Sequence, residues 1–210
     1  MINIVPKVLK NYTLCFLLFL STFCGINAPQ TFAQNWEHKI LTDLHTNRNT
    51  AYDPVGKAIS FSVLPISIAW PVTEFGVGLL KKDKERLKNA ALISLGLFAN
   101  IGLTQALKYS FDRGRPYATY PDLDPVVFQN DPSFPSGHTS AAFHTATLIS
   151  LHYPKWYVIA PASLWASSVG YSRMHLGVHY PTDILAGAIT GAGTAFLSFK
   201  LNKWLMKRWK

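Results

Sequence analysis

Cysteine is almost missing from this chain of 210 residues. Its two cysteines, Cys15 and Cys24, both lie in an apolar run close to the N-terminus. A disulfide framework or a thiolate metal site is therefore excluded from the rest of the chain. Internal repeats and low-complexity tracts are also missing. The length fits a single domain.

Charged residues are scarce as well. They make up 15% of the chain, against about 25% in an ordinary soluble domain, while 49% of the residues are hydrophobic. Mean hydropathy is +0.12, and the formal net charge is +9. A positive charge of this size suits nucleic acid, anionic lipid or a phosphorylated substrate. Because the charges sit in a few short clusters between apolar segments, we expect a membrane and a phosphate as partners, and no nucleic acid.

Residues 1–33 are predicted to be a signal peptide or an N-terminal anchor helix. Lys7 and Lys10 precede the apolar stretch "YTLCFLLFLSTFCGI", and "TFAQ" places Ala33 at a cleavage position. Cleavage is favoured, and an uncleaved anchor is the alternative. Both place residue 34 outside the cytoplasm.

Five further segments are apolar and nearly free of charge. They cover residues 58–80, 89–107, 139–153, 156–172 and 184–199. The first two are long enough to cross a hydrocarbon core of about 30 Å. At about 1.5 Å per residue, the last three segments are too short to cross this core unless each helix extends into its flanking residues. We predict an all-α helical bundle that is membrane-integral with five or six apolar helices; a soluble domain with buried helices is the alternative.

The positive clusters predict the orientation of this bundle. If the apolar segments alternate in direction, the run "KKDKERLK", Lys155 and the C-terminal "KLNKWLMKRWK" fall on the same side as Lys7 and Lys10. This is the positive-inside pattern of membrane proteins. Residues 58–201 are then the helical domain, and residues 202–210 form a basic cytoplasmic tail.

The opposite side receives residues 34–57, the loop 108–138 and the turn 173–183. Within the first, "WEHKILTDL" puts Trp36, Ile40, Leu41 and Leu44 on one helical face. We interpret residues 34–57 as an extracytoplasmic amphipathic segment on the bilayer surface.

Three residue groups in these outward stretches carry the chemistry. They are "KYSFDRGRP", with Lys108 and Arg115; "PSGH", with Ser136, Gly137 and His138; and "SRMHLGVHYPTD", with Arg173, His179 and Asp183. The first pattern arises by chance at about one start in 8,000, and each of the others at about one in 160,000. Since the predicted topology brings all three to one membrane face, chance is a poor explanation.

The residue types suit a phosphate. Lys108, Arg115 and Arg173 supply three positive charges, and the fork of an arginine matches phosphate oxygens. Ser136 offers a hydroxyl, and Gly137 lets the backbone approach closely. Both stand at a predicted helix start, where free N–H groups and the helix dipole favour an anion.

The two histidines have different predicted partners. Pro181 marks a helix start, which puts Asp183 near its third position, within reach of His179. A carboxylate on one ring nitrogen makes the other a better nucleophile. His138 is then left to act as a general acid.

Other polar residues have simpler interpretations. His144, His152 and His175 are taken as satisfied polar residues, and Arg113 and Asp112 as loop salt-bridge partners. Zinc is the competing use of the imidazoles and the carboxylate, but three nearby cationic groups would repel it. We therefore expect neither a metal nor another cofactor.

The three groups resemble the signature of the type 2 phosphatidic acid phosphatase superfamily, which includes bacterial acid phosphatases and vanadium haloperoxidases. The resemblance covers residues 108–183, and the flanking helices agree with its membrane branch. It implies that His179 attacks phosphorus to form a phosphohistidine, that Asp183 orients His179, and that His138 protonates the leaving oxygen and then activates water. It implies no metal, and that the phosphate is bound by Lys108, Arg115, Ser136, Gly137 and Arg173.

We therefore expect a phosphatase with several passes through a bacterial inner membrane and a periplasmic active site. Its substrate would be a lipid phosphate, such as polyprenyl pyrophosphate, phosphatidate, phosphatidylglycerol phosphate or lipid A, and no obligate protein partner is evident. A soluble periplasmic acid phosphatase, a vanadium-dependent haloperoxidase and a membrane scaffold or phosphate-binding transporter component are the alternatives.

Overall fold

In the computed structural model, residues 30–208 are described, with side chains from Trp36 onward. The chain divides into two compact units, residues 1–36 and 37–210, and helix packing is defined within the second. The predicted signal segment 1–33 lies outside the described residues except for its last four positions. Throughout residues 30–208 the regular structure is helical, so the all-α prediction is confirmed.

The helices follow the predicted apolar segments and extend beyond most of them. Residues 58–80 are divided between two helices, and the segment predicted as a separate basic tail continues the last helix to Arg208. The elements are α2 (Gln30–Thr46), the 3-10 turn η1 (Thr50–Tyr52), α3 (Asp53–Phe61), α4 (Val63–Leu80), α5 (Lys84–Phe111), α6 (Pro116–Thr119), α7 (Gly137–His152), α8 (Trp156–His175) and α9 (Pro181–Arg208).

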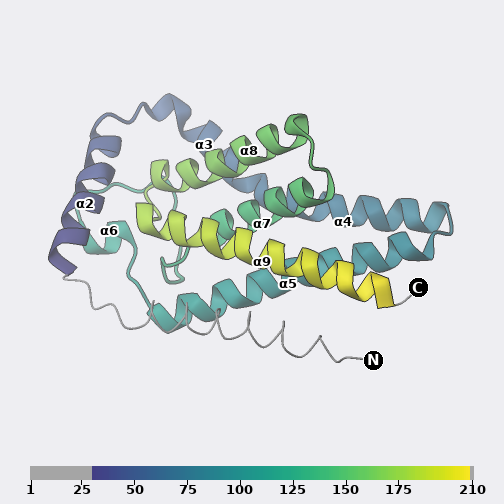
Figure 1. Cartoon of the computed structure of the whole chain (residues 1–210). Helices are drawn as coiled ribbons and strands as arrows, with labels where there is room; N and C mark the ends of the chain where they lie inside the picture. Colours follow the sequence, from purple (N-terminus) through teal and green to yellow (C-terminus); the bar gives the residue numbers. More distant parts are fainter. Residues whose placement is uncertain (1–29, 209–210) are drawn as a thin grey trace. The chain divides into compact units, whose positions relative to one another are not determined.

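Helix α7 lies at the centre of the bundle. It packs against α4, α5, α8 and α9 (Figure 1). Its contact with α9 is made backbone to backbone, because a Cβ on Gly191 would lie 2.1 Å from the Ser140 carbonyl oxygen, and one on Gly187 would lie 2.7 Å from that of Ser136. Small residues permit such approaches in membrane helices. The first turns of α7 and α9 are thereby brought together.

Within residues 30–208, three helical stretches are long and apolar enough to cross a bilayer. They are Thr50–Leu80, Lys84–Thr119 and Pro181–Arg208. The last predicted segment therefore does gain length from its flanks, whereas α7, with 16 residues, spans only about 24 Å. Large apolar side chains, among them Leu64, Phe98 and Leu164, are at least 65% exposed. Exposed apolar surface of this extent is typical of a face that meets lipid.

The two ends of the bundle differ in chemistry. The α4–α5 connection, the start of α8 and the end of α9 share one end, on the right of Figure 1. These are the three basic clusters, so the charge pattern agrees with the predicted alternation of the helices. At the opposite end lie the last turns of α5 and α8 and the first turns of α7 and α9.

Helix α2 confirms the predicted helix in "WEHKILTDL" but not its predicted face. Leu41 is fully buried against Leu123 and Tyr180, whereas Ile40 is 40% exposed. Glu37, one turn before Leu41, is buried with it. The face that contacts the bundle therefore contains a carboxylate, because positions 37, 41 and 44 share one side of the helix.

Candidate active site

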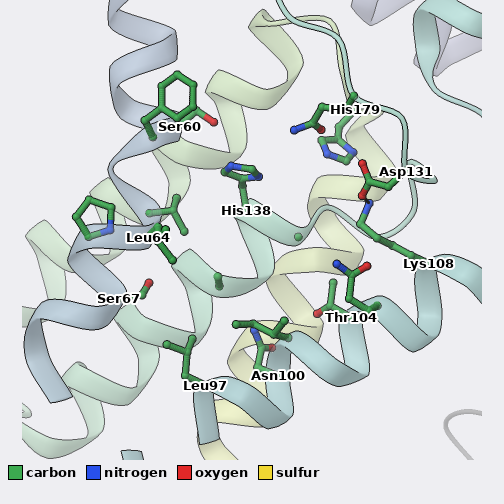
Figure 2. Close-up of a pocket in the computed structure, with 18 residues that line it drawn as sticks. Ser60, Leu64, Ser67, Leu97, Asn100, Thr104, Lys108, Asp131, His138 and His179 are labelled. Atoms are coloured by element: carbon green, nitrogen blue, oxygen red, sulfur yellow. Dashed lines mark ion pairs between the residues drawn. The ribbon is translucent and has the colours of Figure 1, made fainter. Parts of the chain in front are cut away.

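The three sequence groups meet around one cavity of about 450 Å³. Figure 2 shows His138, His179, Asp131 and Lys108 at one end of this cavity, with Leu64, Ser67, Leu97 and Asn100 toward the other. The polar end is built from the last turn of α5, the start of α7 and the α8–α9 connection. Residues separated by long stretches of sequence thus converge, as the predicted topology requires.

Lys108 and Arg115 are both buried and share one carboxylate. The Lys108 Nζ lies 2.9 Å from Asp131 Oδ2, and the Arg115 Nη2 lies 2.7 Å from Oδ1 of the same residue. Arg115 also donates to the carbonyl oxygens of Asp131 and Val178, at 2.9 and 2.8 Å. Asp131 is not among the residues predicted from the sequence, yet its carboxylate lies between two cations that are predicted to bind phosphate.

Arg173 has unused hydrogen-bonding capacity. Its side chain is only 2% exposed, and one Nη donates to the hydroxyl of Ser60 on α3. The Nε and the second Nη are buried without a partner among the described residues. Since buried charged groups are normally paired, two unpartnered nitrogen atoms on one guanidinium are the strongest single indication of an anion site.

Ser136 and Gly137 form the start of α7. The Ser136 Oγ caps the helix by accepting hydrogen bonds from the Thr139 N–H at 3.4 Å and from the Thr139 hydroxyl at 2.9 Å. As the acceptor of both, Ser136 keeps its own hydroxyl hydrogen for another oxygen. A Cβ on Gly137 would lie 3.8 Å from the Lys108 side chain, so this backbone borders the cationic cluster directly.

His179 lies in the turn between α8 and α9, after Gly177 with its φ of +76°. Its Nδ1 is 3.3 Å from Asp183 Oδ2, and its Nε2 is 3.4 Å from Arg115 Nη1. The same Asp183 oxygen accepts from the Tyr180 N–H at 3.0 Å and from the Ser133 hydroxyl. The contact predicted from the spacing of His179 and Asp183 is present, and it leaves Nε2 facing the cations.

A family model described as the PAP2 superfamily matches residues 89–207, which is more than half of the chain. The chain belongs to the PAP2 superfamily.

Several proteins resemble this PAP2 chain over much of its length. A lipid A 1-phosphatase of Porphyromonas gingivalis is 36% identical over 133 residues, which are 62% of this chain and 26% of that protein. An undecaprenyl-diphosphatase of Sulfolobus acidocaldarius is 33% identical over 136 residues, 63% of this chain and 62% of that protein. The chain therefore spans less than two thirds of either relative.

A solved structure resembles the PAP2 chain over nearly its whole length. It is the transmembrane PAP2-type phosphatidylglycerolphosphate phosphatase of Bacillus subtilis, with 26% identity and a TM-score of 0.68, and the match covers 94% of this chain and 95% of that one. The resemblance predicted from the motifs is confirmed. With its three long apolar helices, this PAP2 protein falls in the membrane branch of the superfamily.

The surroundings of the two PAP2 histidines keep both neutral near pH 7. Burial, together with the positive charge of Arg173 and the neighbouring His179, lowers the pKa of His138 to about 3. Burial also lowers the pKa of His179 to about 4, although the Asp183 carboxylate acts in the opposite direction. A neutral imidazole is the form that can act as a nucleophile.

Arg113 corrects one expectation. The sequence suggests a salt bridge within the loop for Arg113 and Asp112, but the Arg113 guanidinium pairs with Glu37 and Asp183, at 2.6 and 2.7 Å. Asp112 is the C-cap of α5 and has a left-handed backbone conformation. Sequence reasoning missed Glu37 as well; an acidic residue within an apolar helical face was the signal that could have found it.

His144, His152 and His175 each have a hydrogen-bond partner, as expected of satisfied polar residues, but the buried Nε2 of His144 has none among the described residues. His144 Nδ1 lies 3.0 Å from the Thr194 hydroxyl, and His152 Nδ1 lies 2.9 Å from a carbonyl oxygen one turn earlier in α7. His175 pairs with Asp53 at 2.8 Å.

Proposed function

We propose that this PAP2 protein is a phosphatase that hydrolyses a lipid phosphate or diphosphate through a phosphohistidine intermediate on His179, without a metal. The free donors of the buried Arg173, beside two imidazoles, carry this proposal. Lys108, Arg115, Ser136 and Gly137 would bind the phosphate with Arg173. Several fixed cations and a helix start are what a phosphate dianion needs when no metal is bound.

The shape of the cavity favours a lipid. From its polar end it continues between α4 and α5, along apolar side chains that include Val63, Leu64, Leu97 and Ile101. A substrate with its phosphate among the cations could therefore keep its hydrocarbon chains beside the apolar helices. The names of the relatives, a lipid A phosphatase and an undecaprenyl-diphosphatase, point to the same class.

In the first chemical step, His179 Nε2 would attack phosphorus. The N–P bond forms as the bond to the leaving oxygen breaks. His138 takes up the proton that enters with the bound phosphate monoanion and gives it to that oxygen. Asp183 holds the Nδ1 proton, so the imidazole presents its unprotonated Nε2 toward Arg115. Lys108, Arg115 and Arg173 offset the negative charge that builds on the phosphoryl oxygens.

In the second step, water would release the phosphate. His138, left neutral by the first step, takes a proton from water as the oxygen bonds to phosphorus and the N–P bond to His179 breaks. The products are inorganic phosphate and the dephosphorylated lipid. The positive clusters at the opposite end of the bundle support a periplasmic position of the site in a bacterial inner membrane.

Phosphate release by the purified protein tests this function. The panel should contain phosphatidate, phosphatidylglycerol phosphate, a polyprenyl diphosphate, lipid A and one water-soluble ester, each measured with and without EDTA. We expect release from at least one lipid, insensitive to EDTA, and a phosphoryl label on His179 after rapid quenching. Release that is abolished by EDTA and restored by a divalent metal would contradict the metal-free mechanism.

The three alternative functions predict different results. A soluble acid phosphatase would leave the membrane pellet on washing with carbonate, whereas we expect this protein to stay in it. A vanadium-dependent haloperoxidase would oxidise halide only after vanadate is added, without releasing phosphate from any substrate. A scaffold or transporter component would release phosphate from none of the panel.

The pKa values of the histidines predict an activity optimum on the acid side of neutrality. As the pH falls through about 4, His179 gains a proton and kcat/KM should fall. Because His138, with a pKa of about 3, is neutral in the free protein at higher pH, the proton for the leaving oxygen must enter with the phosphate monoanion. Phosphate esters lose that proton near pH 6, so kcat/KM should decrease above this pH.

The decrease of kcat/KM at high pH is the alkaline limb of the pH profile. Our explanation of this limb is tested by changing the substrate. An aryl phosphate has a more acidic second ionisation than an alkyl phosphate, so its limb should lie at lower pH. If instead the limb has the same midpoint for both esters, it belongs to a group on the protein.

Replacing Asp131 with Asn should make inorganic phosphate a tighter product inhibitor, by about tenfold. In the free protein its carboxylate contacts both Lys108 and Arg115. Burial acts to raise the pKa of Asp131, but these two cations outweigh it and hold that pKa below its usual range. The carboxylate is thus ionised at pH 7 and competes with phosphate.

The inhibition constant of inorganic phosphate at pH 7 measures this competition. Asp124→Asn is the matched control, because Asp124 lies in the same connection with a side chain that is 91% exposed. A weaker inhibition in Asp131→Asn would show that Asp131 holds the cations in place for phosphate rather than competing with it.

A further inference from the structure

The Asp183 oxygen that does not face His179 is held by Arg113, a residue of the first sequence group that is not among the predicted phosphate-binding residues. The Arg113 Nη1 lies 2.7 Å from Asp183 Oδ1, while Oδ2 faces His179. The other terminal nitrogen of Arg113 lies 2.6 Å from Glu37 Oε2. The guanidinium also stacks on the Tyr180 ring, with its Cζ 3.8 Å from the ring centroid. One planar fork therefore joins the carboxylates of α2 and α9.

Glu37 is bonded to α9 directly as well. Its Oε1 accepts from the Thr182 N–H at 3.1 Å and from the Thr182 hydroxyl. Thr182 is in the first turn of α9, where N–H groups lack helical partners. Glu37 is 2% exposed and Asp183 is fully buried, so each carboxylate depends on the Arg113 charge and on these hydrogen bonds.

We propose that Glu37 and Arg113 are positioning residues for catalysis, which fix the orientation of Asp183 and, through it, that of His179. With Oδ1 held by Arg113, Oδ2 is the oxygen left to face the imidazole, beside the Tyr180 N–H and the Ser133 hydroxyl. The proposal rests on the roles of His179 and Asp183 proposed above. It makes α2, outside the residues that define the superfamily match, a necessary part of the active site.

The docking of α2 does not by itself require this carboxylate. Leu41 is already fully buried against Leu123 and Tyr180. An apolar side chain at position 37 would extend that contact, since replacing a buried ion pair by apolar groups is often neutral or stabilising. Glu37 is instead placed where both its oxygens orient groups adjacent to Asp183.

Several charged or titratable groups surround His179 and set the pH at which it protonates. Asp183 lies on α9, Arg113 and Arg115 follow α5, and Arg173 and His138 approach from α8 and α7. Lys108 and Asp131 form an ion pair in the same cavity. Glu37 acts on His179 only through Arg113 and Asp183, so changes at Glu37 and Arg113 should have opposite effects.

The test compares Glu37→Gln and Arg113→Gln in the full-length protein in detergent. Each should slow phosphohistidine formation in a single turnover by about tenfold or more, the size of effect known for the residues that orient metal-ligating histidines. In Glu37→Gln the Arg113 charge is no longer shared, so the acid limb of kcat/KM should move to lower pH. In Arg113→Gln the Asp183 carboxylate is no longer offset, so the limb should move to higher pH.

Two further variants complete the comparison. Asp43→Asn is the matched control, because it makes the same charge change at an exposed position of α2, and it should equal the unmodified protein in rate and limb. Arg113→Lys keeps the charge but lacks the planar fork, so it should lose rate without moving the limb. If Arg113→Gln does not fold, Arg113→Lys and Glu37→Gln together test the positioning role.

The outcomes separate this inference from the proposed function. If His179→Ala is inactive but Glu37→Gln matches Asp43→Asn in rate and limb, the positioning role is wrong and the phosphatase mechanism stands. A loss of rate in Glu37→Gln with an unmoved limb also overturns the positioning role, since a merely structural defect has that result. If His179→Ala remains active, the proposed mechanism is wrong, and so is the positioning role that rests on it.

Discussion

Replacing His179 with Ala should lower the turnover of every phosphate substrate by about 10⁴-fold or more, the effect expected when a nucleophile is removed from a preorganised site. The imidazole is 1% exposed, with one nitrogen toward Asp183 and the other toward Arg115. Alanine retains the fold around it, because Asp183 keeps its bonds to Tyr180 and Arg113. Phosphate should still bind, since the three cations remain.

Two measurements separate a lost nucleophile from a damaged protein. Binding of inorganic phosphate to His179→Ala should persist while rapid quenching finds no phosphoryl label on the protein. His152→Ala is the control, because His152 is a partly buried histidine away from the site, packed against Trp70 and Phe199, and the variant should keep its activity. Steady turnover by His179→Ala would remove this residue as the nucleophile.

Replacing Arg173 with Met should reduce kcat/KM by about 10³-fold, within the range for groups that stabilise developing charge on a phosphoryl group. The same change should leave Tm unchanged or raise it. Arg173 is buried, and two of its nitrogen atoms have no partner among the described residues, so the fold compensates its charge only in part. An apolar side chain of similar length removes that cost.

Arg48→Met is the matched control for this prediction. Arg48 lies 3.6 Å from Asp53 and donates to the Asp124 carbonyl oxygen at 2.9 Å. Loss of these contacts should lower Tm while activity persists, which is the opposite pattern. Thermal unfolding in detergent and phosphate release on the same samples give both quantities. A clear drop in Tm for Arg173→Met would mean that its guanidinium has structural partners in solution.

The residues that form the cationic site can be recognised in the sequence, whereas the groups that pair with them cannot. Lys108, Arg115, Arg173 and the two histidines belong to compact sequence groups whose residue types suit phosphate. Asp131 and Ser60 stand alone in the sequence. Asp131 is connected to the site by its contacts with Lys108 and Arg115, and Ser60 by its contact with Arg173. No spacing rule applies to such pairs, because helix packing brings them together.

The sequence alone determined the helices, the end of the bundle at which the motifs meet, and the chemistry that those motifs favour. Apolar length, basic clusters and helix-start residues are local signals, so they can be recognised without a fold. Only the tertiary structure decided which carboxylate meets which cation. The partners Glu37 and Thr182 are 145 positions apart, and their contact depends on the close approach of α2 to the first turn of α9. Their relative placement follows from packing, which hydropathy and spacing do not encode.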